Sequence, residues 1–145
     1  MDKSEYYIQM CTQATEIQKQ WSPNHGDFFV GENGGIYPWI AHVHDSREII
    51  QGVGVSFENG MPKVTRYIWL PRLDQLMEIA QDSGRRFENT TQIFFEWIKR
   101  PYQLMLGPPQ KIFSSLEQLW LSFIMNKNFR KQWDGQEWQI IAPLY

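Results

Sequence analysis

A change of pattern within Ile68–Ile79 separates two parts of the chain. Pro71 suits the first turn of a helix, because its ring presets φ and its missing N–H would have no partner there. Leu73, Leu76 and Ala80 then follow at helical spacing. The segment therefore predicts a strand that ends where a helix begins, with a β-rich part before it and a helical part after it.

Length and composition indicate a packed domain. The chain has 145 residues, of which 42% are hydrophobic and 15% aromatic, so it can bury a core and is no disordered tail. One cysteine, Cys11, excludes an intrachain disulfide and a cysteine-cluster zinc site. The first residues do not form a signal peptide, and no run approaches the ~18 apolar residues of a membrane span. We expect a cytoplasmic protein with no membrane contact.

The expected fold class is α+β. We predict a small curled antiparallel sheet of about four strands, preceded by one helix and followed by about three packed helices. One domain is expected over residues 1–145. Its parts are an N-terminal helix, a β region, a helical region and a C-terminal turn that could add an edge strand: residues 1–21, 26–70, 71–132 and 133–145.

Turn signals and glycines shape the β region. Glu32–Gly35 and Asn59–Gly60 have the composition of tight hairpin turns. Between them, Gln51–Glu58 alternates apolar and polar residues as a strand does. Gly52 and Gly54 lie on one face of that strand, where they would permit sharp bending or the close approach of another group.

Capping patterns set the expected helix ends. Asp2 with Glu5, and Ser114 with Glu117, have the spacing of capping boxes. The helix that follows the second box is expected to end near Gln132. It is apolar nearly all round in its first half, so we expect it to be central or to be covered by another chain.

Three residues form the best catalytic candidate. His42 and His44 would point to one face of a strand, and Asp45 follows them. Such a pair could hold zinc or a redox metal, with Asp45, or His25 and Asp27, as further ligands. A polar strand face near a turn is the favoured interpretation, since two histidines alone are weak evidence.

Other catalytic patterns find little support. The sequence has no nucleophile elbow and no phosphate-binding loop. Asp74 and Glu78 share a helix face, but this spacing is typical of a solvated surface, and Arg72 is expected to make a structural ion pair with Asp74. We therefore assign no catalytic, cofactor-binding or metal residue and no cofactor. Whether the chain is an enzyme stays open, with a non-enzyme favoured.

Four aromatic residues of the β region allow two interpretations. They could form a stacking platform for bases or a sugar ring, or they could be buried between sheet and helices, which is favoured because large rings mostly bury. These residues are Tyr37, Trp39, Tyr67 and Trp69.

The charge is unevenly distributed. The net charge is −2, made of −5 over residues 1–59 and +3 over residues 60–145. Nucleic-acid binding would use the basic residues of the second part: Arg85, Arg86, Lys99, Arg100, Lys127, Arg130 and Lys131. A dedicated nucleic-acid binder usually has a stronger basic field, so this function is possible but not favoured.

Four segments carry a resemblance to a family. The segments Trp69–Leu76, Leu116–Met125 and Lys131–Trp138, with Gly26–Phe28 upstream, resemble small phage- and prophage-encoded proteins of Gram-positive bacteria. Their motifs read W-L-P-R-Q-D-Q-L and G-K-x-W-D-G-x-x-W. Leu73 replaces the usual Gln, and Arg130 replaces the usual Gly. The family has no established activity, so the resemblance implies an origin and a bacterial cytoplasmic location.

These observations lead to three hypotheses. The leading one is a non-enzymatic accessory protein of phage or prophage type that acts through protein–protein contact, with itself as a homodimer or with another protein. The alternatives are a nucleic-acid-binding protein and a histidine-based metal enzyme. The motif residues are interpreted as structural: Trp69, Pro71, Arg72, Asp74, Trp120, Trp133, Asp134, Gly135 and Trp138.

Overall fold

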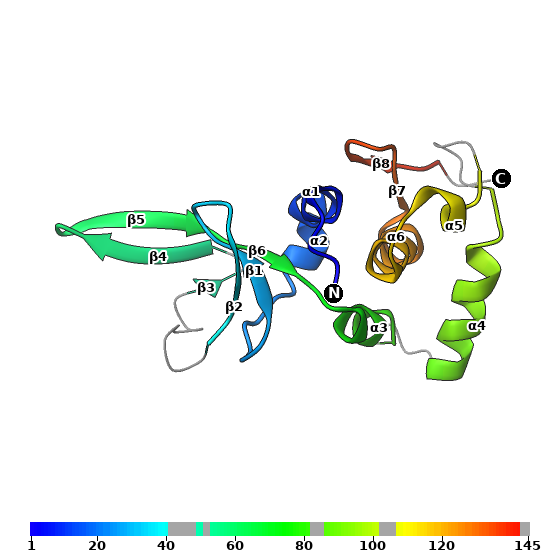
Figure 1. Ribbon diagram of the computed structural model, residues 1–145, viewed down its shortest axis with the longest axis horizontal. Helices are drawn as coiled ribbons and strands as arrows, with labels where there is room; N and C mark the ends of the chain where they lie inside the picture. Colours follow the sequence, from blue (N-terminus) through cyan, green and yellow to red (C-terminus); the bar gives the residue numbers. More distant parts are fainter. Residues whose placement is uncertain (41–48, 51–52, 82–85, 102–106, 143–145) are drawn as a thin grey trace. The chain divides into compact units, whose positions relative to one another are not determined.

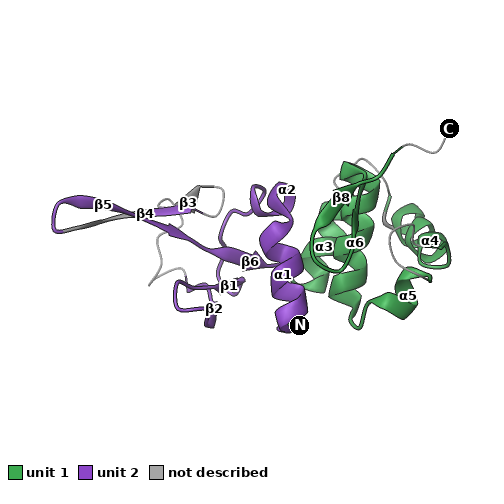
Figure 2. Cartoon of the chain, turned by 90° about the horizontal axis from the view of Figure 1, so that it is seen from above, with its two compact units in different colours: residues 1–2, 72–145 green, residues 3–71 purple. Residues whose placement is uncertain are grey.

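The computed structural model describes residues 1–40, 49–50, 53–81, 86–101 and 107–142. It combines helices with antiparallel strands, so the predicted α+β class is confirmed (Figure 1). The chain divides into two compact units (Figure 2): unit 1 is Met1–Asp2 with Arg72–Tyr145, and unit 2 is Lys3–Pro71. The boundary coincides with the predicted strand-to-helix junction. The single domain over residues 1–145 stays a prediction.

Unit 2 begins with two short helices where one was expected. Helix α1 spans Glu5–Gln13 and α2 spans Thr15–Gln18, with Ala14 out of the helical region at φ −81° and ψ 66°. Ser4 caps α1, because its side chain accepts a hydrogen bond from the N–H of Tyr7 at 3.2 Å. The predicted cap at Asp2 is therefore wrong.

Two three-stranded antiparallel sheets form the β part of unit 2. In the first, the order is β2-β1-β6, with bounds Ile36–Pro38, Phe28–Val30 and Ile68–Leu70. In the second, the order is β3-β4-β5, with bounds Ile49–Ile50, Val53–Glu58 and Met61–Arg66. The prediction of one sheet of about four strands matches only roughly, because there are two sheets, and the chain after the Asn59–Gly60 turn forms two strands, β5 and β6, divided at Tyr67.

Both predicted hairpin turns are present. The first connects β1 to β2, where Val30 pairs with Ile36. The second connects β4 to β5 through Asn59 and Gly60, which have φ values of 52° and 76°. Two successive positive φ values suit Asn-Gly, because Asn tolerates this region and Gly has no Cβ to clash.

Helix α1 packs on β6 in the core of unit 2. The Gln18 side chain donates from Nε2 to the Trp69 carbonyl at 2.9 Å and accepts from the Trp69 N–H at 2.8 Å. It satisfies the backbone of β6 as a neighbouring strand would. The Tyr7 hydroxyl donates to the Pro71 carbonyl at 2.7 Å, which fixes the end of the strand.

Unit 1 is organised around one buried helix. Its elements are α3 Leu73–Gln81, α4 Phe87–Trp97, α5 Pro109–Ile112, α6 Leu116–Phe129, β7 Lys131–Trp133 and β8 Trp138–Ile140. Helices α3 and α4 and strand β7 all pack against α6, which is buried from Trp120 to Met125. Of the two interpretations of its apolar surface, the central position is the one observed.

An aromatic cluster joins α4 to α6. The rings of Phe94 and Trp120 are stacked with centroids 4.1 Å apart. Phe123 meets Phe94, Trp97 and Trp120 edge-on, at 5.4, 5.5 and 5.6 Å. Offset-stacked and edge-on pairs are the favourable arrangements of aromatic rings, so this cluster packs α4 against α6.

The start of α6 differs by one residue from the predicted cap. Ser115 is the N-cap, since its Oγ accepts from the N–H of Gln118 at 3.1 Å, and Gln118 Oε1 accepts from the N–H of Ser114 at 3.1 Å. Asp2 accepts from Ser115 Oγ at 2.5 Å and from Gln118 Nε2 at 2.7 Å. Glu117 forms an ion pair with the N-terminal ammonium at 3.5 Å. The chain start is thus fixed to this helix end.

The end of α6 was predicted too late. The helix stops at Phe129 because Arg130 has a left-handed backbone, with φ 53° and ψ 43°. β7 begins at the next residue, so the expected helical stretch to Gln132 is wrong. No helix in the described ranges is long and apolar enough to cross a membrane.

Replacing Arg130 by glycine is expected to stabilise the protein. A left-handed backbone is strained for a residue with a Cβ, and glycine removes that strain at some cost in unfolded-chain entropy, so we expect a gain of about 0.5–1 kcal/mol. Urea unfolding measures it. Arg130→Ala is the matched control, since it keeps the Cβ; an equal gain in both variants would show that the backbone conformation is not the cause.

Candidate functional site

The W-D-G-x-x-W motif forms the hairpin between β7 and β8. Trp133 pairs with Trp138 across the two strands, with ring centroids 5.1 Å apart. Asp134 Oδ1 accepts from the N–H groups of Gln136 and Glu137, both at 2.8 Å. Gly135 supplies a φ of 105°. Each motif residue therefore has a role in a turn, and the interpretation of these residues as structural stays a prediction.

Stability should fall when Asp134 is protonated. The backbone N–H groups of Glu137 and Gln136 hold the pKa of this carboxyl below its ordinary value, which is about 3.9. Because the pKa of Asp134 is lower in the folded than in the unfolded state, its carboxylate stabilises the fold fully at pH values above the unfolded-state pKa. This stabilisation is lost as the pH falls through the folded-state pKa. Unfolding of the wild type and of Asp134→Asn from pH 5 downward tests this. We expect the stability difference between them to shrink below about pH 4; a constant difference would contradict it.

The W-L-P-R motif lies at the boundary between the units, and each half is described within its own unit. Trp69 is buried in unit 2 and stacks on Trp21 at 6.2 Å. In unit 1, Arg72 Nε and Nη2 donate to Asp74 Oδ1 and Oδ2 at 3.1 and 3.2 Å. The Arg72 side chain lowers the pKa of Asp74. The expected Arg72–Asp74 pair is confirmed, and Glu78 is exposed on the same helix.

The histidine hypothesis falls mostly outside the described residues. His42, His44 and Asp45 lie within 41–48, which the structure does not describe. His25 is exposed, whereas Asp27 is buried and accepts from Trp21 Nε1 at 3.0 Å and from the N–H of Asn24 at 2.9 Å. Among the residues that are described, no three His, Cys, Asp or Glu side chains are placed to hold a metal ion. The metal site stays a prediction.

An open groove in unit 2 is the best-formed candidate site. Its volume is about 510 Å³, within the usual range of ligand pockets. We name it the tyrosine groove; the described residues that line it are Phe29, Gly31, Glu32, Asn33, Tyr37, Pro38, Ile40 and Tyr67. They come from β1, β2, the turn between these strands, the residues directly after β2 and the bend between β5 and β6, so the groove is built by several segments rather than by one.

Tyr37 is held in an exposed position by its own hairpin. Its side chain is 41% exposed. A Cβ added at Gly35 would lie 2.6 Å from the Tyr37 hydroxyl oxygen, and one at Gly31 would lie 3.1 Å from the ring. Asn33 Nδ2 donates to that hydroxyl at 2.6 Å. The two glycines let the ring lie across the turn, and the amide fixes its tip.

Tyr67 is positioned in a similar way. A Cβ added at Gly54 would lie 2.7 Å from Cε2 of the Tyr67 ring, which confirms the predicted close approach at this glycine; Gly52 lies outside the described residues. Phe29 is buried between the two tyrosines, with centroids 6.1 Å from Tyr37 and 5.4 Å from Tyr67. The three rings therefore form one aromatic surface, in which Tyr37 and Tyr67 are accessible and Phe29, 4% exposed, lies beneath them.

The groove has a charged rim. Glu32 Oε2 lies 3.6 Å from Lys63 Nζ, and Glu32 Oε1 accepts from Thr65 Oγ1 at 3.4 Å. Side-chain exposure is 56% for Glu32 and 46% for Lys63. Both contacts are long and in water, so the pair is worth little, and the carboxylate can exchange Lys63 for another cation.

The four aromatic residues of the predicted stacking platform differ in exposure. Trp39 and Trp69 are 3% and 6% exposed, which agrees with the favoured interpretation as buried residues. Tyr37 is exposed and Tyr67 is partly exposed, so for these two rings burial was the wrong expectation. The sequence signal that could have separated them is the placing of Gly31 and Gly35 around Tyr37.

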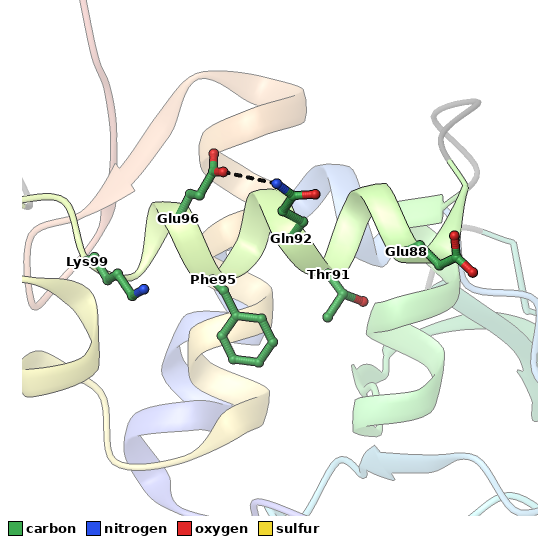
Figure 3. Close-up of a pocket in the computed structure, with 6 residues that line it drawn as sticks. All are labelled: Glu88, Thr91, Gln92, Phe95, Glu96 and Lys99. Atoms are coloured by element: carbon green, nitrogen blue, oxygen red, sulfur yellow. Dashed lines mark hydrogen bonds between the residues drawn. The ribbon is translucent and has the colours of Figure 1, made fainter.

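A second concavity lies along α4 in unit 1 (Figure 3). Its volume is about 610 Å³, and its described lining is Glu88, Thr91, Gln92, Phe95, Glu96 and Lys99. Phe95 is 53% exposed, and Gln92 donates to Glu96 at 3.4 Å. All six residues come from one helix and the turn after it, so this surface is less well formed than the groove.

Of the basic residues named for nucleic-acid binding, those near α4 are mixed with acidic ones. Arg86, Lys99 and Arg100 are exposed near α4, where Glu88 and Glu96 line the same surface. Arg85 lies outside the described residues. A surface with both signs lacks the continuous basic field that phosphates require.

Comparison with family models, curated proteins and solved structures finds no match to this chain.

Proposed function

We propose that the chain is a non-enzymatic accessory protein of the phage or prophage type that its motifs resemble, and that it binds an extended segment of a partner protein in the tyrosine groove. The setting of this proposal is the bacterial cytoplasm. The observation that carries it is Tyr37, a large ring kept in water by two close glycines and an amide.

The composition of the groove supports a protein ligand. Exposed tyrosine is favoured at protein interfaces, because its ring supplies apolar area and its hydroxyl a polar contact. A hydrophobic floor at Phe29 with polar groups at the rim is the common anatomy of such surfaces. A groove this small suits a short extended segment rather than a whole domain.

The charges of the rim disfavour a nucleic acid. Glu32 lies beside the rings, where a stacked base would bring its phosphate close. Among the described residues, Lys63 is the cation paired with the Glu32 carboxylate, and its charge is offset by that carboxylate. Proteins that bind single-stranded nucleic acids combine stacking rings with a positively charged groove. The described rim of the tyrosine groove does not have this positive charge.

A random-peptide selection tests the proposal. An mRNA-displayed dodecapeptide library is selected against the whole chain and re-tested on Tyr37→Ala, with Phe95→Ala as a control that removes an exposed ring elsewhere. We expect peptides that bind the wild type and Phe95→Ala alike and bind Tyr37→Ala about tenfold more weakly, as for a central interface tyrosine. Failure to recover any peptide that depends on Tyr37 would contradict the proposal.

The homodimer is a separate prediction. One of its supports is weakened, because the apolar surface of α6 is covered by α3, α4 and β7 of the same chain. Light scattering at several protein concentrations tests it. A constant monomer mass would leave a different protein as the partner.

A further inference from the structure

We infer that the tyrosine groove accepts a proline-rich segment in the left-handed polyproline conformation, with a basic side chain placed beside Glu32. This inference rests on the proposed function and names the chemistry of the partner segment. It depends on four features of unit 2, which are the aromatic surface, the tyrosine hydroxyls, the edge strand and the rim charge.

The aromatic surface matches the shape of such a segment. Rings of Phe29, Tyr37 and Tyr67 lie in contact along the groove, with Pro38 beside them. Proline-rich segments bind to grooves lined by aromatic rings, because the rigid pyrrolidine rings pack against them with little loss of entropy. An open groove with a ring floor therefore fits this ligand better than it fits a flexible chain.

The tyrosine hydroxyls can donate to the ligand. The Tyr37 hydroxyl accepts the Asn33 amide at 2.6 Å, so its own proton points elsewhere. Within the described ranges, neither this proton nor the hydroxyl of Tyr67 has a hydrogen-bond acceptor. A polyproline segment makes no internal hydrogen bonds and presents its carbonyls to the surroundings. The hydroxyls of Tyr37 and Tyr67, beside the aromatic floor, can donate hydrogen bonds to those carbonyls.

The edge strand disfavours binding by strand addition. β2 lies at the edge of the sheet β2-β1-β6, where an extended partner could pair with its backbone. Pro38 ends this strand and has no N–H to donate. The strand is also only three residues long. The groove therefore offers side chains rather than a backbone ladder.

The rim charge selects a basic residue. The Glu32–Lys63 contact is long and exposed, so it costs little to break. An arginine from the ligand can form two parallel hydrogen bonds with a carboxylate, which a lysine cannot. Exchange of Lys63 for a ligand arginine therefore improves the pairing of Glu32.

Fluorescence anisotropy with defined peptides tests the inference on the full chain. The probes are labelled decaproline, the same peptide with an arginine at each end, and a glycine–serine peptide of equal length. We expect decaproline to bind and the glycine–serine peptide not to bind. The arginine peptide should bind about threefold to fivefold more tightly than decaproline at low salt, since exposed ion pairs are screened as salt rises.

Variants assign the binding to the groove. We expect Tyr37→Ala to weaken decaproline binding about tenfold and Phe95→Ala to leave it unchanged. Glu32→Gln should abolish the preference for the arginine peptide without changing decaproline binding, and Lys63→Gln should increase that preference. Tyr37→Phe keeps the ring and removes only the hydroxyl, so it serves if the alanine variant fails to fold. We expect it to weaken binding less than Tyr37→Ala but measurably.

Two results would overturn the inference. One is the absence of decaproline binding up to about 1 mM, the weak end of specific affinities. The other is equal binding by the wild type and both Tyr37 variants. If the random library yields peptides that depend on Tyr37 but lack proline, the inference fails while the proposed function stands.

Discussion

Replacing Trp120 by alanine should unfold unit 1 under conditions in which the wild type is stable. The side chain is buried, stacks on Phe94 at 4.1 Å and meets Phe123 edge-on. Removing it loses both ring contacts and leaves a cavity at the junction of α4 and α6. The expected loss is about 3–5 kcal/mol, a large part of the total stability of an ordinary domain. Urea unfolding followed by circular dichroism measures it.

Two controls accompany this variant. Trp120→Phe keeps an aromatic ring and is expected to lose much less stability than Trp120→Ala. Phe95→Ala removes an exposed ring from α4 and is expected to change the free energy of unfolding by about 0.5 kcal/mol or less. A Trp120→Ala variant as stable as Phe95→Ala would show that the cluster does not hold the helical unit together.

Replacing Trp21 by alanine should have a similar effect on unit 2. Trp21 stacks on Trp69 at 6.2 Å, meets Trp39 edge-on at 5.9 Å and donates from Nε1 to Asp27 at 3.0 Å. The variant loses these ring contacts and takes one donor from a buried carboxylate. We expect a loss of about 3–5 kcal/mol. Trp21→Phe keeps a ring without the donor, so the difference between the variants separates packing from the hydrogen bond.

Amide spectra of the Trp21→Ala variant show which part is lost. We expect the dispersed signals of residues in unit 2 to collapse. An intact set of unit 2 signals would contradict the central packing role of this ring. The same spectra test the predicted single domain, because joint loss of both units supports one cooperative domain and survival of unit 1 contradicts it.

Local patterns predicted several elements of the fold well. Asn59 and Gly60 gave the β4–β5 hairpin, because few other residues adopt two positive φ values in succession. The apolar surface of α6 predicted a helix that is central or covered by another chain, and the first of these is observed. Pro71 predicted the place where the β part gives way to the helical part. In each case a short stretch of sequence determines the geometry by itself.

Other features depend on distant contacts and could not be predicted from local patterns. Asp2 looked like a helix cap, but its partners Ser115 and Gln118 lie more than a hundred residues away in sequence. The predicted end of α6 lies too far along the chain, because arginine is common in helices and its identity gives no sign of a left-handed backbone at position 130. The left-handed backbone of Arg130 ends the helix there, and β7, which pairs with β8, begins at the next residue.

The candidate site also combines features that local sequence patterns predict with features that depend on distant contacts. Tyr37 and Trp39 are two residues apart and would be expected to lie on one face of a strand. Both rings contact Phe29, but Tyr37 is exposed and Trp39 is buried, because Trp39 also packs against Trp21. The tyrosine groove was therefore visible in the sequence only as a set of aromatic residues, not as a surface.

Amide chemical-shift mapping of the labelled chain with decaproline tests the central claim most directly. If the tyrosine groove is the binding surface and the motif residues build the fold, the shifts should gather at Gly31–Tyr37 and Tyr67 and leave the β7–β8 hairpin unchanged. Shifts centred on that hairpin or on Phe95, with none at Tyr37, would contradict it.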